Sequence, residues 1–187
     1  MTPASLDLTL RPATPKDIAA LSRLGRDSFA EKFGHLYRPE DLAAFLDEAH
    51  APATLAREIA DPQRRYCLAV AGGTLAGYCK LAIPSSLADH GDFSRPIEIK
   101  QLYTDPARTG RGIGAALMTW ALDEAQAHDA DAIQLSVWSG NDDAQRFYAR
   151  YGFAKTADIH FWVGEQRDDE FLFTLNLRTS ARHPGGL

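Results

Sequence analysis

Three glycines at alternate positions constrain this chain more than any other feature of its sequence. Gly110, Gly112 and Gly114 lie in the segment DPARTGRGIGAAL, between a β-rich run and a run with helical periodicity. Glycine lets the backbone approach a ligand closely, and the free N–H groups at a helix N-terminus bind anions. A tight turn that only packs helix on strand would need one glycine. The segment therefore predicts a strand–turn–helix unit that binds a phosphate or pyrophosphate.

Two phosphate-binding motifs can be compared with this turn. A Walker loop needs Gly-Lys followed by Ser or Thr, and no such triplet is present. A dinucleotide fingerprint matches superficially at Gly110, Gly112 and Ala115, but it also needs an acidic residue about 20 positions later. Trp-Ser-Gly stands there instead, at residues 138–140. Neither type of nucleotide fold is favoured.

Periodicity in the rest of the chain predicts a mixture of strands and helices. Strands are expected at residues 8–11, 66–71, 75–83, 97–104 and 132–138, with two more after Phe153, the last at 171–177. Helices are expected from Thr14, after Pro39, and at residues 53–60, 113–127 and 141–151. The Gly72-Gly73 pair predicts a hairpin between two of the strands. The order indicates an α/β domain with an antiparallel first half and a helical crossover.

Alternation along the strand at 97–104 predicts which of its side chains share a face. One face is expected to hold Ile97, Ile99, Gln101 and Tyr103. The opposite face is expected to hold Glu98, Lys100 and Leu102.

Length and charge narrow the class of protein further. The 187 residues suit a single domain over 1–187, with flexible termini at 1–6 and 178–187. A net charge of −5 argues against nucleic-acid binding, which needs clustered basic residues. No apolar run approaches the roughly 20 residues of a membrane span, and the first residues lack the features of a secretory signal. These features predict a cytoplasmic protein that binds neither membrane nor nucleic acid.

Metal and covalent chemistry find no support in the sequence. Cys67 and Cys79 have no metal-site spacing and read as ordinary strand residues. The six histidines are scattered, and no serine lies in a G-x-S-x-G elbow. We therefore expect no metal site and no covalent intermediate on the protein.

Two motifs together resemble the GNAT family of acetyl-CoA-dependent N-acetyltransferases. LYTDPARTGRGIGAAL is similar to the family's strand, turn and Arg/Gln-x-x-Gly-x-Gly/Ala helix start, and VWSGNDDAQRFYARYGF to its later strand, Asn and aromatic helix. The two motifs cover residues 97–153. The resemblance implies a three-layer α+β fold whose mixed, mostly antiparallel central sheet of about six or seven strands is flanked by helices. Acetyl-CoA is the implied cosubstrate, and CoA the product.

The resemblance also implies a cofactor site. The backbone of Leu102, Tyr103 and Thr104 is expected to splay from its neighbour and pair with the pantetheine arm and acetyl carbonyl. Pyrophosphate would be held by the turn, which comprises Thr109, Gly110, Arg111, Gly112, Ile113, Gly114 and Ala115. Thr109 stands where the family has Arg or Gln, so the family's side-chain contact is absent there, and Arg111 could add charge at the rim. Asn141 would face the pantetheine arm or, alternatively, cap its helix.

Two catalytic residues are expected. By resemblance, Tyr148 is the acid that protonates the departing thiolate; the alternative is a core aromatic, because it shares helical spacing with Ala144 and Tyr151. Glu98 is the candidate base, which would accept the amine proton through water. Its alternative role is a solvated or salt-bridged carboxylate. Direct transfer in a ternary complex is the expected mechanism.

The acceptor is expected to be a small primary amine. IEIKQLY and the acidic FWVGEQRDDE segment resemble the bacterial spermidine/spermine acetyltransferase branch, and acidic walls would suit a polyamine. A solvated hairpin tip explains the same acidic residues. A protein N-terminal amine or an antibiotic amine remains open as substrate, as does a homodimer. A non-catalytic acyl-CoA sensor is the alternative function, although such a sensor has no need of Tyr148.

Overall fold

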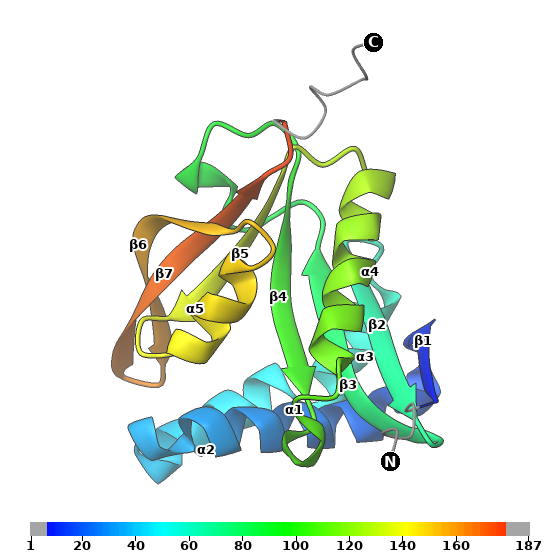
Figure 1. The fold of residues 1–187 in the computed structure, drawn as a ribbon. Helices are drawn as coiled ribbons and strands as arrows, with labels where there is room; N and C mark the ends of the chain where they lie inside the picture. Colours follow the sequence, from blue (N-terminus) through cyan, green and yellow to red (C-terminus); the bar gives the residue numbers. More distant parts are fainter. Residues whose placement is uncertain (1–6, 179–187) are drawn as a thin grey trace.

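One seven-stranded sheet organises the chain in the computed structural model, which describes residues 7–178 (Figure 1). Its order is β1-β2-β3-β4-β5-β7-β6. All neighbouring strands are antiparallel except β4 and β5, which are parallel. The strands are β1 (Leu8–Pro12), β2 (Arg64–Ala71), β3 (Thr74–Ala82), β4 (Pro96–Thr104), β5 (Ala132–Trp138), β6 (Ala154–Val163) and β7 (Gln166–Asn176). This confirms the predicted mixed, mostly antiparallel sheet.

Helices cover both faces of the sheet and complete the predicted three layers (Figure 1). One face is covered by α1 (Ile18–Phe33), α2 (Pro39–Ala49) and α3 (Pro52–Ala60). The opposite face is covered by α4 (Ile113–Ala127) and α5 (Asp142–Ala149). The helix expected from Thr14 begins as a 3-10 turn at Pro15–Asp17, where Thr14 and Asp17 form a capping box.

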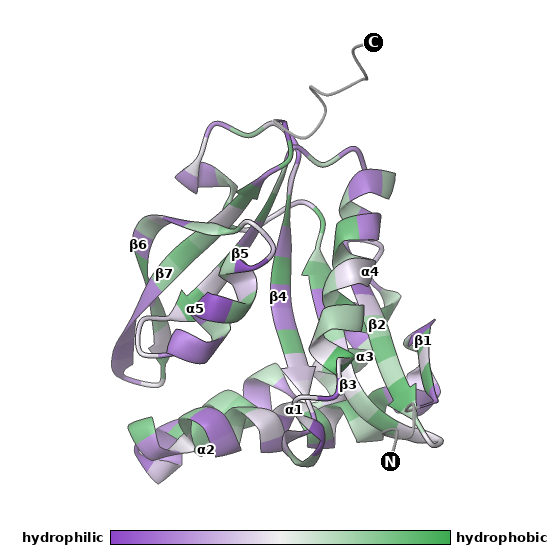
Figure 2. Cartoon of the chain, viewed as in Figure 1, coloured by the Kyte–Doolittle hydropathy of each residue, from purple (hydrophilic) through white to green (hydrophobic). Residues whose placement is uncertain are grey.

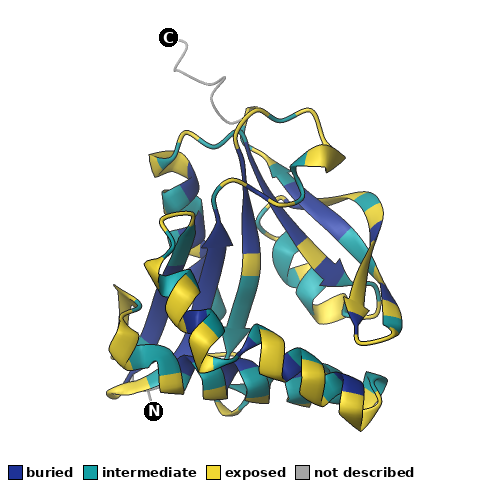
Figure 3. Cartoon of the chain, turned by 180° about the vertical axis from the view of Figure 1, so that it is seen from behind, coloured by how far each residue is buried: buried dark blue, intermediate teal, exposed yellow. Residues whose placement is uncertain are grey.

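Three apolar clusters hold the layers together. The largest lies between α4 and strands β2 to β5, a second between α1, α3 and β2–β3, and a third between α1, α2 and the end of β6. Figure 2 shows hydrophobic residues along β2 beneath α4, whereas α2 and α5 carry polar residues as well. In Figure 3 the buried residues concentrate in the strands and the exposed ones on the outer helices.

The alternation predicted for β4 is wrong beyond its middle. Ile97 and Ile99 pack in the α4 cluster as expected, but Leu102 joins them there, while Tyr103 packs in the clusters beneath α1. A bulge causes the switch, because Lys80 pairs with Gln101 and Leu81 with Ile99, which leaves Lys100 as an extra residue. The faces of β4 therefore exchange in the segment that the sequence assigns to the cosubstrate.

Strands β4 and β5 part soon after they meet. They pair only over Pro96–Glu98 and Ala132–Gln134, although β4 continues to Thr104 and β5 to Trp138. The diverging strands are visible in Figure 1. The backbone N–H and C=O groups along the unpaired stretches have no partner in the neighbouring strand, so they can bind a ligand.

The two ends of the chain lie mostly outside the described residues. Of the predicted flexible termini at 1–6 and 178–187, residues 1–6 and 179–187 lie outside the described residues. Arg178, which the prediction placed in the flexible tail, is held by an ion pair of 2.8 Å with Asp131. Within residues 7–178, no helix has the length and apolar content to cross a membrane.

Candidate active site

A cleft of about 1700 Å³ lies where β4 and β5 diverge. Residues 98–104 of β4 line one side and residues 136–138 of β5 the other. At one end the cleft reaches the glycine turn and α5, and at the other it reaches α1, α2 and β6. A single cavity therefore joins the predicted phosphate site to the opposite helical layer.

The glycine turn has the backbone conformation that the sequence predicted. Gly110 has a φ of +74° and Gly112 a φ of +79°, in the left-handed region where glycine is favoured. Gly112 is the N-cap of α4, so the first N–H groups of that helix have no intrahelical acceptor. Thr109, Gly110, Gly112, Ile113, Gly114 and Ala115 all line the cleft. The turn thus presents free donors at the positive end of a fifteen-residue helix.

Side-chain charge contributes little at the turn. The Thr109 hydroxyl donates to the Pro106 carbonyl at 3.4 Å, and Arg108 is engaged with Asp105 at 3.3 Å and with the Ala71 carbonyl at 3.1 Å. Within the described part of the chain, Arg111 lies outside the cleft lining, on the exposed side of the turn. Two other arginines, Arg146 and Arg150, line the cleft from α5 and its end. Sequence reasoning overlooked them because their direction depends on how α5 packs.

Tyr148 and Asn141 both lie in the wall of the cleft. The Tyr148 ring packs against Phe147 and Phe153, and its phenol forms no hydrogen bond with residues 7–178. Burial raises the pKa of Tyr148, so the phenol is protonated at neutral pH. Asn141 caps α5 by accepting from the Ala144 N–H at 3.3 Å. Capping leaves the Asn141 amide nitrogen available to the cleft.

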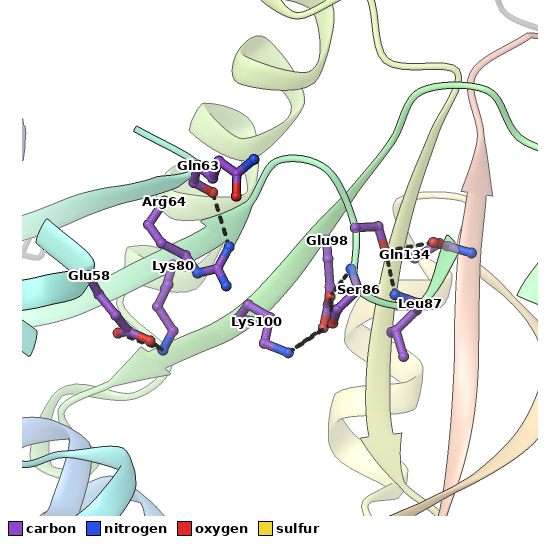
Figure 4. A network of polar contacts seen from close by, with 10 residues as sticks. Glu58, Gln63, Arg64, Lys80, Ser86, Leu87, Glu98, Lys100 and Gln134 are labelled. Carbon is purple, nitrogen blue, oxygen red and sulfur yellow. Dashed lines mark hydrogen bonds and ion pairs between the residues drawn. The ribbon is translucent and has the colours of Figure 1, made fainter. Parts of the chain in front are cut away.

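Glu98 lies at the point where β4 and β5 separate, and its side chain is already engaged. Its carboxylate accepts from the Ser86 N–H at 2.9 Å and the Ser86 hydroxyl at 2.6 Å, and it pairs with Lys100 at 2.9 Å (Figure 4). It is only 3% exposed. A second buried pair joins Lys80 to Glu58 at 3.0 Å on the same side of the sheet. The predicted alternative for Glu98, a salt-bridged carboxylate, describes this geometry.

Three of the four acidic side chains in residues 165–170 are engaged by neighbouring side chains. Glu165 pairs with Arg38 at 3.0 Å, Asp168 accepts from the Tyr37 hydroxyl, and Asp169 pairs with His160 at 3.2 Å. Glu170 differs: it lines the cleft, and its carboxylate has no hydrogen-bond or ion-pair partner among residues 7–178. Burial, followed by the Asp168 charge, raises the pKa of Glu170 to about 7.

The end of the cleft away from the glycine turn is walled by aromatic rings. Phe33 meets Trp138 edge-on with ring centres 6.2 Å apart, and Phe45 meets Phe161 at 5.7 Å. Trp162, which also lines the cleft, is 59% exposed. These rings come from α1, α2, β5 and β6, so no single stretch of sequence signals the wall.

Comparison with known proteins agrees with this architecture. The sequence profile described as "Acetyltransferase (GNAT) family" matches residues 26–153. The chain belongs to this family. An uncharacterised N-acetyltransferase from the pepI 3' region of Lactobacillus delbrueckii subsp. lactis is 30% identical over 84% of this chain and 90% of its own length. The N-alpha-acetyltransferase RimI of Mycobacterium tuberculosis is 33% identical over 75% of this chain and 80% of its own.

A solved structure shows the same fold. The PaiA N-acetyltransferase of Thermoplasma acidophilum, in complex with coenzyme A, superposes with a TM-score of 0.76 over 91% of this chain and 99% of that one, at 21% identity. Family membership makes this chain an N-acetyltransferase of the GNAT type with acetyl-CoA as cosubstrate. The glycine turn with its free N–H groups and the long cleft beyond it suit a pyrophosphate and an extended thioester arm.

Proposed function

We propose that this GNAT acetyltransferase moves the acetyl group directly from acetyl-CoA to a primary amine while both are bound. The observation that carries this proposal is the single cleft, which runs from the glycine turn past Tyr148 to a second wall formed by α1, α2 and β6. Two substrates entering from opposite ends would meet between the separated ends of β4 and β5. Proximity of this kind converts a bimolecular reaction into a step within one complex.

The cysteines support direct transfer over a relay through the protein. Cys67 is 2% exposed and Cys79 is fully buried, and both lie within the sheet rather than in the cleft lining. Burial raises the pKa of Cys67 to about 11, which opposes formation of a nucleophilic thiolate. Neither thiol is placed to carry the acetyl group.

Each end of the cosubstrate has a proposed set of contacts. The turn residues Thr109 to Ala115 would hold the pyrophosphate through backbone N–H groups, with Arg111 at the rim. The unpaired backbone of Leu102, Tyr103 and Thr104 would pair with the pantetheine arm and the acetyl carbonyl, and Asn141 would face the arm. Acetyl-CoA supplies the activated acyl group. Support for the placement comes from the strand separation, which leaves these β4 groups without a β5 partner.

We assign proton donation to Tyr148. The amine nitrogen attacks the thioester carbon, the new N–C bond forms, and the C–S bond breaks. The departing sulfur then accepts the phenolic proton, and the proton released from the former amine nitrogen restores the phenol. Tyr148 suits this role because burial keeps its phenol protonated and no protein acceptor in residues 7–178 competes for its proton.

The acceptor is proposed to be an amine with one cationic group near the reacting centre. The polyamine expectation relied on four acidic residues, of which three are occupied by Arg38, Tyr37 and His160. Of these four, only Glu170 lines the cleft, where it suits an ammonium group, and the aromatic wall suits an apolar substituent beside it. A polyamine and a peptide N-terminus are therefore separate arms of the substrate screen.

Replacing Tyr148 by Phe tests the chemistry. We expect Tyr148→Phe to lower kcat at least tenfold with the best amine, while the Kd for CoA changes less than twofold, because only the hydroxyl is lost. Assays of CoA release measure kcat, and calorimetric titration measures the Kd for CoA. Asp142→Asn, an exposed change at the start of the same helix outside the cleft lining, is the matched control. A kcat for Tyr148→Phe equal to that of the control would remove Tyr148 as the acid.

A further inference from the structure

We propose that Glu170 binds the ammonium group of the acceptor and removes its proton, and so acts as a catalytic base. This inference rests on the proposed function and assigns a role within the same cleft. Strand β7 places the residue there: Glu170 is in register with Trp138 of β5 and with Ile159 of β6. Paired residues of neighbouring strands share a face, and both of these neighbours line the cleft.

Glu98 and Glu170 lie on the same face of the sheet, at different distances from its point of separation. Glu98 pairs with Gln134, whereas Glu170 pairs with Trp138, four residues farther along β5. At roughly 3.3 Å per residue, Glu170 lies about 13 Å farther toward the open end of the cleft. Of these two carboxylates, Glu170 is therefore the one nearer the mouth of the cleft.

The two carboxylates also differ in what occupies them. Three contacts, from the Ser86 N–H, the Ser86 hydroxyl and Lys100, surround Glu98. A carboxylate that already accepts from three donors has fewer lone pairs left to accept from an entering ammonium group. Glu170 has no such partner among residues 7–178 and is only partly exposed. A desolvated, unpaired carboxylate favours a bound ammonium group as its counter-ion.

The charged and titratable groups around Glu170 favour the same role. Asp168 on β7 adds negative charge, Lys100 on β4 partly offsets it, and Glu170 in turn raises the pKa of Tyr37 and Tyr103. On β6, Asp158 and His160 flank Ile159, the register partner of Glu170, and they are paired with Lys155 and Asp169 respectively. The Glu170 pKa of about 7 lets the carboxylate exchange protons near neutrality.

Tyr103 connects the proposed base to the proposed acid. It lies near enough to Glu170 for that carboxylate to raise its pKa, and near enough to Tyr148 to contribute to the raised pKa there. Tyr148, Tyr103 and Glu170 therefore lie near one another in the lining of one cleft. A bound amine can face the base while the leaving sulfur faces Tyr148.

The proton balance of the step is simple. The ammonium group gives one proton to a Glu170 oxygen, and the freed nitrogen lone pair attacks the thioester carbon. When the C–S bond breaks, Tyr148 protonates the sulfur, and the second nitrogen proton restores the Tyr148 phenol. Glu170 then releases its proton to solvent, so that one proton appears for each ammonium acetylated.

The pH profile of kcat/KM tests Glu170 directly. In the wild-type protein the rate should rise as pH increases through about 7, because the carboxylate must be deprotonated to accept a proton. The Glu170→Gln variant should not show that rise, and its kcat/KM at pH 7 should be about 100-fold lower than that of the wild type. Its rate should approach that of the wild type above the pKa of the amine, where the substrate deprotonates in solution. Glu98→Gln should keep the rise through pH 7, whatever its absolute rate.

Two further measurements separate the outcomes. Glu165→Gln, on the same hairpin but outside the cleft lining, controls for charge removal and should leave the profile unchanged. An unchanged Kd of Glu170→Gln for CoA shows that the variant is folded. If the wild type is active and Glu170→Gln has the same pH profile, the assignment of Glu170 as the base is wrong, but the proposed function stands. If the wild type releases no CoA with any amine, the proposed function fails as well.

Discussion

Gly112 illustrates what a single backbone conformation contributes to this protein. Its φ of +79° turns the chain so that α4 begins in the lining of the cleft. An added Cβ would meet no atom within 4 Å, so sterics with neighbours are irrelevant at this position. The requirement for glycine comes from the left-handed dihedral alone.

A pair of alanine variants isolates that effect. Gly112→Ala and Gly73→Ala both place a side chain at nearly the same φ, +79° and +75°, in open space. Each should lower the free energy of unfolding by about 1–2 kcal/mol, measured by urea titration. Only Gly112→Ala should also raise the Kd for CoA, by about tenfold, because only its turn lies in the cleft. Equal CoA affinities for the two variants would contradict the role of the turn.

The glycine turn was predictable from sequence, whereas Glu170 was not. Left-handed glycines before a helix are a local signal, and the structure places all the predicted turn residues except Arg111 in the cleft lining. The difference between Glu170 and its acidic neighbours depends on partners distant in sequence, such as Arg38 for Glu165 and Tyr37 for Asp168. The sequence shows the four acidic residues but not which of them are engaged by other side chains.

Helix α1 packs against the sheet through a residue that has no side chain. Gly25 lies in the middle of α1, where a Cβ would be 2.5 Å from Nδ1 of His50 and 2.9 Å from the Tyr78 hydroxyl. His50 and Tyr78 are both buried to 1% exposure or less, so neither can move aside easily. The close approach of α1 to the sheet therefore depends on glycine.

Adding a methyl group to α1 tests this packing. Gly25→Ala gains about 1 kcal/mol of helix propensity but overpacks a buried site, and we expect a net loss of about 1–2 kcal/mol in unfolding free energy. In Gly34→Ala, at the end of the same helix, the added Cβ meets the tip of Leu42 at 3.4 Å and Ala30 Cβ at 4.0 Å, so the unfolding free energy should change by less than about 0.5 kcal/mol. Thermal or urea unfolding gives both values. A Gly25→Ala protein as stable as Gly34→Ala would show that the core accommodates the methyl group.

Elements were predictable to different degrees. The predicted strands and helices were found, because periodicity and turn residues are local properties. The bulge in β4 was not predicted from the sequence, since it arises from the pairing of Lys80 with Gln101 and of Leu81 with Ile99. Because of that pairing, Leu102 and Tyr103 each lie on the face of the sheet opposite to the one predicted, within the strand that borders the active site.

At the scale of the whole molecule, the active site follows from how the sheet divides. The antiparallel strands β1 to β4 and β5 to β7 form two halves joined by only three paired positions between β4 and β5. Helices α4 and α5 flank the opening on one face, and α1 and α2 flank it on the other. The cleft thus connects an anion site at a helix terminus with a partly apolar wall, which allows two dissimilar substrates to meet.

The central claim is that one cleft brings acetyl-CoA and a primary amine together for direct transfer. The most direct measurement follows CoA release and the masses of amine and protein when acetyl-CoA is supplied with and without spermidine, amino acids or short peptides. The account predicts CoA release only with an amine, acetylation on the amine nitrogen, and no change in protein mass. Tight CoA binding without turnover across all of these amines, or a burst of CoA with acetylated protein, would contradict it.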